Sequence, residues 1–249
     1  MHVSAVERDP RAYEHIDPQL VGNARRIVVS DQAGRSNILS NFKSIGLDLD
    51  QGDRRVARLL DEVKAREFDG YAYDDAGASF ELLARRTLDE VPEFFQLRSF
   101  RVINERRWNA KGELVTMAEA TAKVHVGGRE ELTVADGIGP VDALDRALRK
   151  SLVGVYPTLA EMRLVDYKVR ILTPQEGTKA VTRVLIESQG PGGGRWCTIG
   201  VSANIVDASF NALSDAITYM LFKQGRRPAG DLADKSAQQQ RRTADNACP

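Results

Sequence analysis

The stretch TVADGIGPVDALDRAL at residues 133–148 recurs 65 positions later as TIGVSANIVDASFNAL at residues 198–213. Both stretches start at the end of a predicted strand, cross a short junction and continue with apolar residues at helical spacing. Each copy as a whole reads as three strands followed by a helix. Because two similar halves bury their apolar faces best against each other, this duplicated βββα unit predicts an α+β domain for pairing or ligand sensing.

Alternation identifies the strands of the first copy. Alanine and valine occupy every second position from Ala118 to Val126, as a half-buried antiparallel strand requires. Gly127-Gly128 supplies a turn before a third strand. The second copy repeats the pattern, with a glycine-rich hairpin at 190–194. We expect the copies to span about 94–156 and 160–224, as two three-stranded antiparallel sheets that each carry a helix.

The rest of the chain divides by composition and period. The spacing of apolar residues changes from about 3.6 to 2 at Val91-Pro92, which predicts a boundary between a small, mostly helical domain at 26–91 and the repeat domain at 92–224. Residues 1–25 contain two Asp-Pro pairs and read as an extended tether. Residues 225–249 have one leucine and no aromatic residue, so a disordered tail is expected there.

Composition excludes several classes of protein. The 35 basic residues balance the 35 acidic ones, so no net field exists to hold nucleic acid or an anionic membrane surface. No stretch approaches the roughly 20 apolar residues that a membrane-spanning helix needs. Cys197 and Cys248 lie in different predicted contexts, which indicates reduced thiols and a cytoplasmic protein.

Catalytic and metal-binding patterns are missing from the sequence. The three histidines are His2, His15 and His125, and none belongs to a metal-ligand spacing such as H-x-H or H-E-x-x-H. His125 alternates outward on its predicted strand and reads as an ordinary surface residue. The glycines at 192–194 lack the Lys-Ser/Thr of a phosphate loop and read as a hairpin tip. We therefore expect no resident metal and no catalytic centre in the repeats.

The two strand-to-helix junctions are the candidate binding sites. Asp136-Gly137-Ile138-Gly139-Pro140 and Ser202-Ala203-Asn204-Ile205 each lead into a helix, whose unpaired N–H groups and dipole favour a carboxylate. Helix capping alone is an alternative explanation for Ser202 and Asn204. An apolar amino acid would need N–H donors for its carboxylate, an acceptor such as Asp136 for its ammonium, and an apolar wall. The repeat can supply all three at a symmetric interface.

Many separate motifs, taken in order, resemble one enzyme family. MHVSAV at 1–6, PRAYEHI at 10–16, LVGN at 20–23 and VSDQAGRSN at 29–37 are similar to the region that follows the catalytic barrel of citramalate synthases, relatives of 2-isopropylmalate and homocitrate synthases. DGIGPVDAL at 136–144, LVDYKVRIL at 164–172 and WCTIGVS at 196–202 resemble that family's carboxyl-terminal regulatory domain. The resemblance covers residues 1 to about 224.

The resemblance implies a whole protein that condenses acetyl-CoA with pyruvate to give citramalate, on the route to isoleucine. In that family a divalent metal in the barrel polarises the keto acid, and a base removes a proton from the acetyl methyl group. This sequence has no counterpart of the barrel or its H-x-H metal motif, so we expect the chain alone to be inactive. His2 and Tyr13 are similar to a histidine and a tyrosine that assist catalysis in a partner subunit's barrel.

The resemblance also implies a homodimer that binds a branched-chain amino acid as a feedback effector. Isoleucine is the expected effector, with leucine as the alternative. The residues that the resemblance and the junctions together assign to the effector are Asp136, Gly137, Gly139, Pro140, Val141, Asp142, Val165, Tyr167, Val169, Ser202, Ala203, Asn204 and Ile205.

Two other functions are compatible with parts of this pattern. A free-standing amino-acid-sensing module that regulates another protein would need the same repeat and no barrel. Double-stranded RNA binding also uses strands followed by a helix, but the neutral charge balance and the lack of a basic stripe argue against it.

Overall fold

The computed structural model describes residues 42–43, 45–47 and 54–233. The chain forms two compact units, residues 1–75 and 76–249. In the first unit, α3 (Arg54–Phe68) buries the apolar positions that the sequence places at helical spacing, among them Val56, Leu59 and Val63. The expected tether at 1–25 lies outside the described residues.

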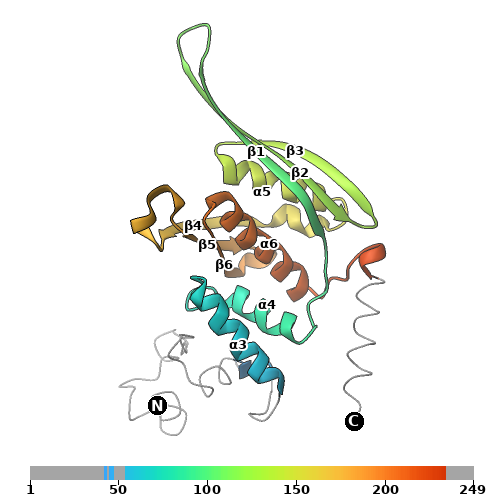
Figure 1. Cartoon of the computed structure of the whole chain (residues 1–249). Helices are drawn as coiled ribbons and strands as arrows, with labels where there is room; N and C mark the ends of the chain where they lie inside the picture. Colours follow the sequence, from blue (N-terminus) through green and yellow to red (C-terminus); the bar gives the residue numbers. More distant parts are fainter. Residues whose placement is uncertain (1–41, 44, 48–53, 234–249) are drawn as a thin grey trace. The chain divides into compact units, whose positions relative to one another are not determined.

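The second unit is α+β, as predicted (Figure 1). Its helices and strands are α4 (Gly77–Thr87), β1 (Gln96–Trp108), β2 (Leu114–Val126), β3 (Arg129–Gly137), α5 (Pro140–Leu152), β4 (Arg163–Ile171), β5 (Thr182–Gln189), β6 (Arg195–Ser202) and α6 (Ile205–Lys223). Short 3-10 helices η3 (Pro157–Glu161), η4 (Pro174–Lys179) and η5 (Pro191–Gly193) connect strands and helices of this unit. The strands form two three-stranded sheets, β1-β2-β3 and β4-β5-β6.

Both sheets are antiparallel meanders, and the middle strand of each carries the inner face. On β2 the residues from Ala118 to Val126 that share one face are buried, and α5 packs against that face. On β5 the buried positions include Val184 and Ile186, which lie under α6. The predicted turns are present at Gly127-Gly128 and at 190–194.

The duplication extends to single hydrogen bonds. Thr133 Oγ1 donates to the carbonyl of Ala147 at 2.8 Å, and Thr198 Oγ1 donates to the carbonyl of Ala212 at 2.8 Å. These pairs are equivalent positions of the repeat, and each joins the last strand of a sheet to the middle of its helix. The contact of sheet and helix is close in both copies, since each threonine hydroxyl reaches a helix carbonyl; Thr198 is fully buried and Thr133 partly buried.

Helix α6 belongs to both copies. Its amino-terminal half packs on its own sheet, with Ala208, Ala212 and Leu213 against Val184 and Ile186. Its carboxyl-terminal half, from Ala216 to Leu221, is part of the core that β2 and α5 of the first copy build. A helix that is apolar on most sides needs such double burial, and Figure 1 shows α6 in the middle of the unit.

The β1–β2 hairpin is longer than the sheet to which it belongs. β1 and β2 have 13 residues each, whereas β3 pairs with β2 only from Ala118 to Val126. The hairpin beyond this point projects as a two-stranded ribbon (Figure 1). Trp108 near its tip is 70% exposed.

Helix α4 packs with the repeats. We expected the domain boundary near 91, but the compact units divide at 75/76, and α4 contacts both α6 and β6. The Ser79 hydroxyl accepts a hydrogen bond from the Ile199 N–H at 3.0 Å and donates to Asp215 at 2.8 Å. Since β6 is an edge strand, α4 covers backbone groups that would otherwise offer a site for pairing with another chain.

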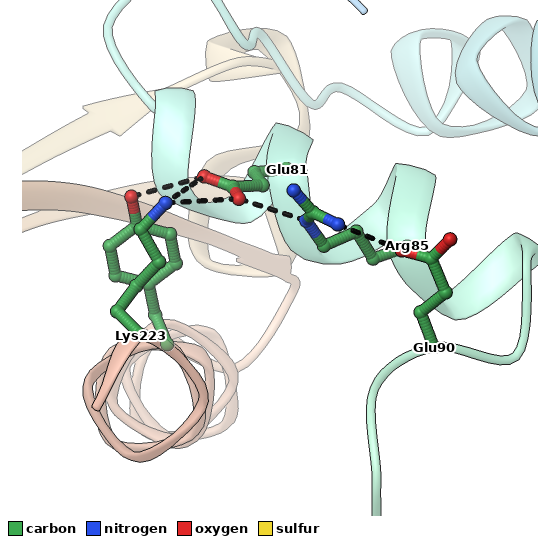
Figure 2. Close-up of polar contacts among 5 residues, drawn as sticks. Glu81, Arg85, Glu90 and Lys223 are labelled. Carbon is green, nitrogen blue, oxygen red and sulfur yellow. Dashed lines mark hydrogen bonds and ion pairs between the residues drawn. The ribbon is translucent and has the colours of Figure 1, made fainter. Parts of the chain in front are cut away.

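A buried carboxylate links α4 to α6 (Figure 2). Glu81 is 4% exposed and accepts hydrogen bonds from Arg85, from Tyr219 and from the ammonium of Lys223. Arg85 also pairs with Glu90 at 2.8 Å. Burial, reinforced by the Glu81 carboxylate, raises the pKa of Tyr219, so its hydroxyl stays protonated and continues to donate at alkaline pH.

The carboxyl-terminal expectation is wrong for residues 225–233. We predicted disorder from 225 onward, but Leu232 is fully buried and Asp231 contacts His125. The low apolar content of the segment was misleading because its single leucine is buried and the neighbouring residues contact the β2–β3 turn. Residues 234–249 lie outside the described residues.

The closeness of sheet and helix in the second copy gives a first prediction. A Cβ on Gly200 would lie 1.9 Å from the carbonyl oxygen of Ala208, which is backbone and cannot move aside. Gly200→Ala should therefore lower the free energy of unfolding by about 3 kcal/mol, measured by urea denaturation. Gly194→Ala is the matched control, because nothing lies within 4 Å of its Cβ. Equal midpoints for the two variants would show that the helix does not pack this closely.

The charge cluster gives a second prediction. Glu81→Gln removes the charge that Arg85 and Lys223 share and should cost about 2 kcal/mol of stability, reduced from the value of a fully buried pair because Lys223 is half exposed. Glu90→Gln changes a carboxylate that is 41% exposed and should cost less than about 0.5 kcal/mol. Thermal unfolding of both variants checks this, and a larger loss for Glu90→Gln would overturn the assignment.

Candidate ligand site at the two strand-to-helix junctions

The first junction leads from β3 into α5 and is held by its own aspartate. The Asp142 carboxylate accepts a hydrogen bond from the Ile138 N–H at 2.9 Å and another from Arg146 at 2.9 Å. Gly139 is the N-cap in extended conformation, and Pro140 occupies the first turn as predicted. A Cβ on Gly137 would lie 2.3 Å from the Ala143 nitrogen, so only glycine permits this approach of strand to helix.

The second junction leads from β6 into α6 and caps itself. The Asn204 side chain accepts from the Val206 N–H at 2.9 Å, and the Ser202 hydroxyl accepts from the Asn204 N–H at 3.1 Å. These contacts satisfy the capping explanation of both residues. Ala203 and Ile205 are exposed beside them, Ile205 by 43%. A ligand carboxylate here would use backbone N–H groups that the cap leaves open.

Val141 and Tyr167 bring the two copies together. Both side chains are partly buried against the core of the second sheet, which contains Ala208 at the start of α6. The Tyr167 hydroxyl lies 2.8 Å from the Ser209 hydroxyl, which itself donates to the Ile205 carbonyl at 2.6 Å. Tyr167 therefore donates to Ser209. The structure thus joins one junction residue of the first copy to β4 and to the second helix.

An apolar strip lies uncovered beside this contact. Val169 is opposite Val184 in register, so its side chain shares the face on which α6 packs, yet it is 43% exposed. Val165 is 39% exposed at the bulge of β4, and Ile171 is 56% exposed. Ile205, also exposed, begins α6, the helix that packs on the same sheet. We call the exposed apolar side chains of Val165, Val169, Ile171 and Ile205 the apolar wall.

Asp136 lies apart from this wall. It is opposite Glu119 in the register of β2 and β3 and is exposed, on the sheet face that alternates away from α5. Within one chain it does not meet Tyr167 or the start of α6. On β4 itself, the pKa of Asp166 is lowered because Lys168 donates a hydrogen bond to it.

Two hollows of the surface lie elsewhere. One of about 350 Å³ is lined by Glu161, Arg163 and the 190–193 hairpin, and another of about 290 Å³ by Arg86, residues 91–95 and Thr218. Neither contains a predicted effector residue. Neither hollow lies at the candidate site, which in a single chain is an open apolar surface.

Three further points concern the predicted catalytic residues, metal binding and membrane-spanning helices. His2 and Tyr13 lie outside the described residues. Within residues 42–43, 45–47 and 54–233, no three His, Cys, Asp or Glu side chains gather as a metal site would require. No helix in the same part of the chain is long and apolar enough to cross a membrane.

Sequence reasoning missed one contact at the far end of the first sheet. His125, read as an ordinary surface residue, is only 12% exposed and lies against Asp231. No sequence signal could reveal this pair, because 106 positions separate the two residues.

Comparison with known proteins agrees with this architecture. Residues 76–221 match the LeuA allosteric (dimerisation) domain, and residues 1–68 match the homocitrate synthase post-HMGL domain-like family. The first match begins at the boundary of the second unit and includes α4.

Individual relatives carry one name. The chain is 49% identical over 223 residues to (R)-citramalate synthase of Geobacter sulfurreducens and 48% identical over 231 residues to that of Streptomyces coelicolor. It is 28% identical over 226 residues to the (R)-citramalate synthase of Methanocaldococcus jannaschii. The aligned parts cover 89 to 92% of this chain and 42% of each of these relatives, so the chain spans well under half their length. The chain therefore belongs to the family of the LeuA allosteric (dimerisation) domain, and it is similar to the carboxyl-terminal part of citramalate synthases.

Proposed function

We propose that this chain is the feedback-regulatory part of a citramalate synthase-type acyltransferase, which condenses acetyl-CoA with pyruvate. In this proposal the chain pairs with a second copy and binds a branched-chain amino acid, isoleucine before leucine. The observation that carries the proposal is the uncovered apolar wall beside a self-capped helix start, in a chain of an allosteric dimerisation family.

The wall suits the side chain of an aliphatic amino acid. Val165, Val169 and Ile205 supply apolar surface, and the start of α6 supplies backbone donors for a carboxylate. Each of these apolar side chains is about two-fifths exposed in the single chain. A pocket that discriminates isoleucine from leucine needs a second wall, since shape decides between isomers by only about 1–3 kcal/mol.

A second chain of the same protein would supply that second wall. Two chains related by a two-fold axis would present the same apolar strip to each other. Asp136, which is exposed on the outer face of the first sheet, would serve the ammonium group across such an interface. The first junction (Gly137, Gly139, Pro140, Val141 and Asp142) belongs to the proposed site because Val141 packs against the core of the second repeat in the same chain.

His2 and Tyr13 belong to the proposal as residues that act on a partner's barrel. Nothing in the described residues bears on them. The divalent metal of the reaction would be held by that barrel, and acetyl-CoA would bind there as a substrate.

A titration tests the effector proposal. Calorimetry of the purified chain with isoleucine, leucine and valine should show binding in the micromolar-to-millimolar range, tightest for isoleucine. Val169→Ser removes part of the wall and should weaken isoleucine binding about tenfold. Lys168→Ser, one position along β4 and on the opposite face, should leave the affinity within about twofold. Absence of heat with all three amino acids, together with an unchanged melting temperature, would contradict the proposal.

A further inference from the structure

We propose that the turn between β2 and β3 is a docking site for the chain's own residues 228–233, which act as a latch between the two copies of the repeat. This segment begins beyond residue 221, where the family match ends. The segment follows α6, whose first half packs on the second sheet. The segment itself contacts His125 of the first sheet. The site is defined by three contacts of different kinds.

The first contact is backbone against backbone. Gly230 has φ +65°, and a Cβ there would lie 2.3 Å from the Gly128 nitrogen and 2.5 Å from the Gly127 carbonyl carbon. Gly127 and Gly128 also have positive φ, 62° and 78°. The glycines on both sides therefore let the two chain segments approach with no room for a side chain.

The second contact is a carboxylate on a histidine. The Nε2 atom of His125 lies 2.8 Å from one oxygen of Asp231 and 3.0 Å from the other. The imidazole side chain is only 12% exposed, whereas that of Asp231 is 47% exposed. The ring is thus largely covered, and one carboxylate occupies its open nitrogen.

The third contact is the burial of an aliphatic side chain. Leu232 is fully buried, although its neighbour Asp231 is exposed. The backbone of Ala229 lies beside the hydroxyl of Tyr156, which donates to the Phe94 carbonyl at 3.1 Å. Burying one leucine contributes about 2 kcal/mol toward holding the segment in place.

Charge contributes little beyond the direct bond. The Nδ1 atom of His125 has no hydrogen-bond partner and lies 3.8 Å from Glu130. Glu130 already pairs with Lys123 and Arg98, each at 2.9 Å. The two carboxylates near the ring, of Glu130 and Asp231, are thus equal in number to the two cations on Glu130, Lys123 and Arg98. The site therefore selects its occupant by shape and pattern: a glycine, then a carboxylate, then an aliphatic residue.

The latch has a mechanical consequence. The carboxyl-terminal half of α6 lies in the core of the first copy, and the latch fastens the chain beyond that helix to the far end of the first sheet. A closed latch holds α6 in its place between the two sheets. An open latch removes the contacts beyond the helix and leaves those of the shared core, so the last turns of α6 and the end of the first sheet gain freedom to move against each other.

Two glycines of equal backbone strain allow a matched test. Gly230→Ala places a methyl group against the Gly128 backbone, whereas Gly225→Ala imposes the same strain at φ +63° with nothing within 4 Å. The full chain has three histidines, so His125→Gln assigns the His125 ring signals by NMR. In Gly230→Ala the His125 signals should move to the position of an exposed histidine, with the latched population reduced at least about tenfold. Gly225→Ala should leave them unchanged.

A second variant and a competitor complete the experiment. Leu232→Asn should shift the His125 signals as Gly230→Ala does, without touching the glycine contact. A synthetic peptide of residues 228–235, added to the Gly230→Ala chain, should restore the latched signals, and the same peptide with Asp231→Asn should restore them less. Unchanged His125 signals in both variants, or equal shifts in Gly230→Ala and Gly225→Ala, would overturn the proposal.

Discussion

The double burial of α6 is the constraint on which the second unit depends. Its first half covers the sheet of its own copy, and its second half completes the core of the other copy. The core between the second sheet and α6 is small, with five buried residues of which three lie on α6, so that sheet gains much of its support through the shared helix. A helix that must fit two surfaces at once cannot shift without disturbing both. This explains why close contacts, such as the paired threonine hydrogen bonds and the approach of Gly200 to Ala208, lie along the helices.

Asymmetry between the copies carries the features that distinguish them. α4 covers the β6 edge of the second sheet and is tied to α6 through Ser79 and Glu81. The first sheet instead has a long hairpin at one end and the segment around Leu232 at the other. The candidate ligand wall lies on the second sheet, where α6 leaves Val169 and Ile171 uncovered. Duplication thus supplies the frame, and the additions decide which faces are closed and which stay open.

Local pattern was enough to predict the repeat, because alternation and helical spacing are properties of neighbouring residues. The strands around Ala118 and the helices after both junctions follow directly from it. Contacts between distant residues were beyond its reach. The helical spacing of α4 says nothing about which unit it joins, and the segment around Leu232 contacts residues more than a hundred positions earlier. At the site, the chemistry of Ser202 and Asn204 was predicted as capping or binding, and the structure shows the capping bonds. The face on which Asp136 lies needed the register of β2 and β3.

A regulatory role fits a chain whose described residues hold a shared core and an open apolar wall. The central proposal is that a second chain of the same protein closes that apolar wall. Light scattering coupled to size-exclusion chromatography measures this most directly, over a range of micromolar concentrations. We expect a particle of twice the 27.5 kDa chain mass, and Val169→Lys should shift it toward the single chain. A mass of 27.5 kDa at every concentration, with and without isoleucine, would contradict it.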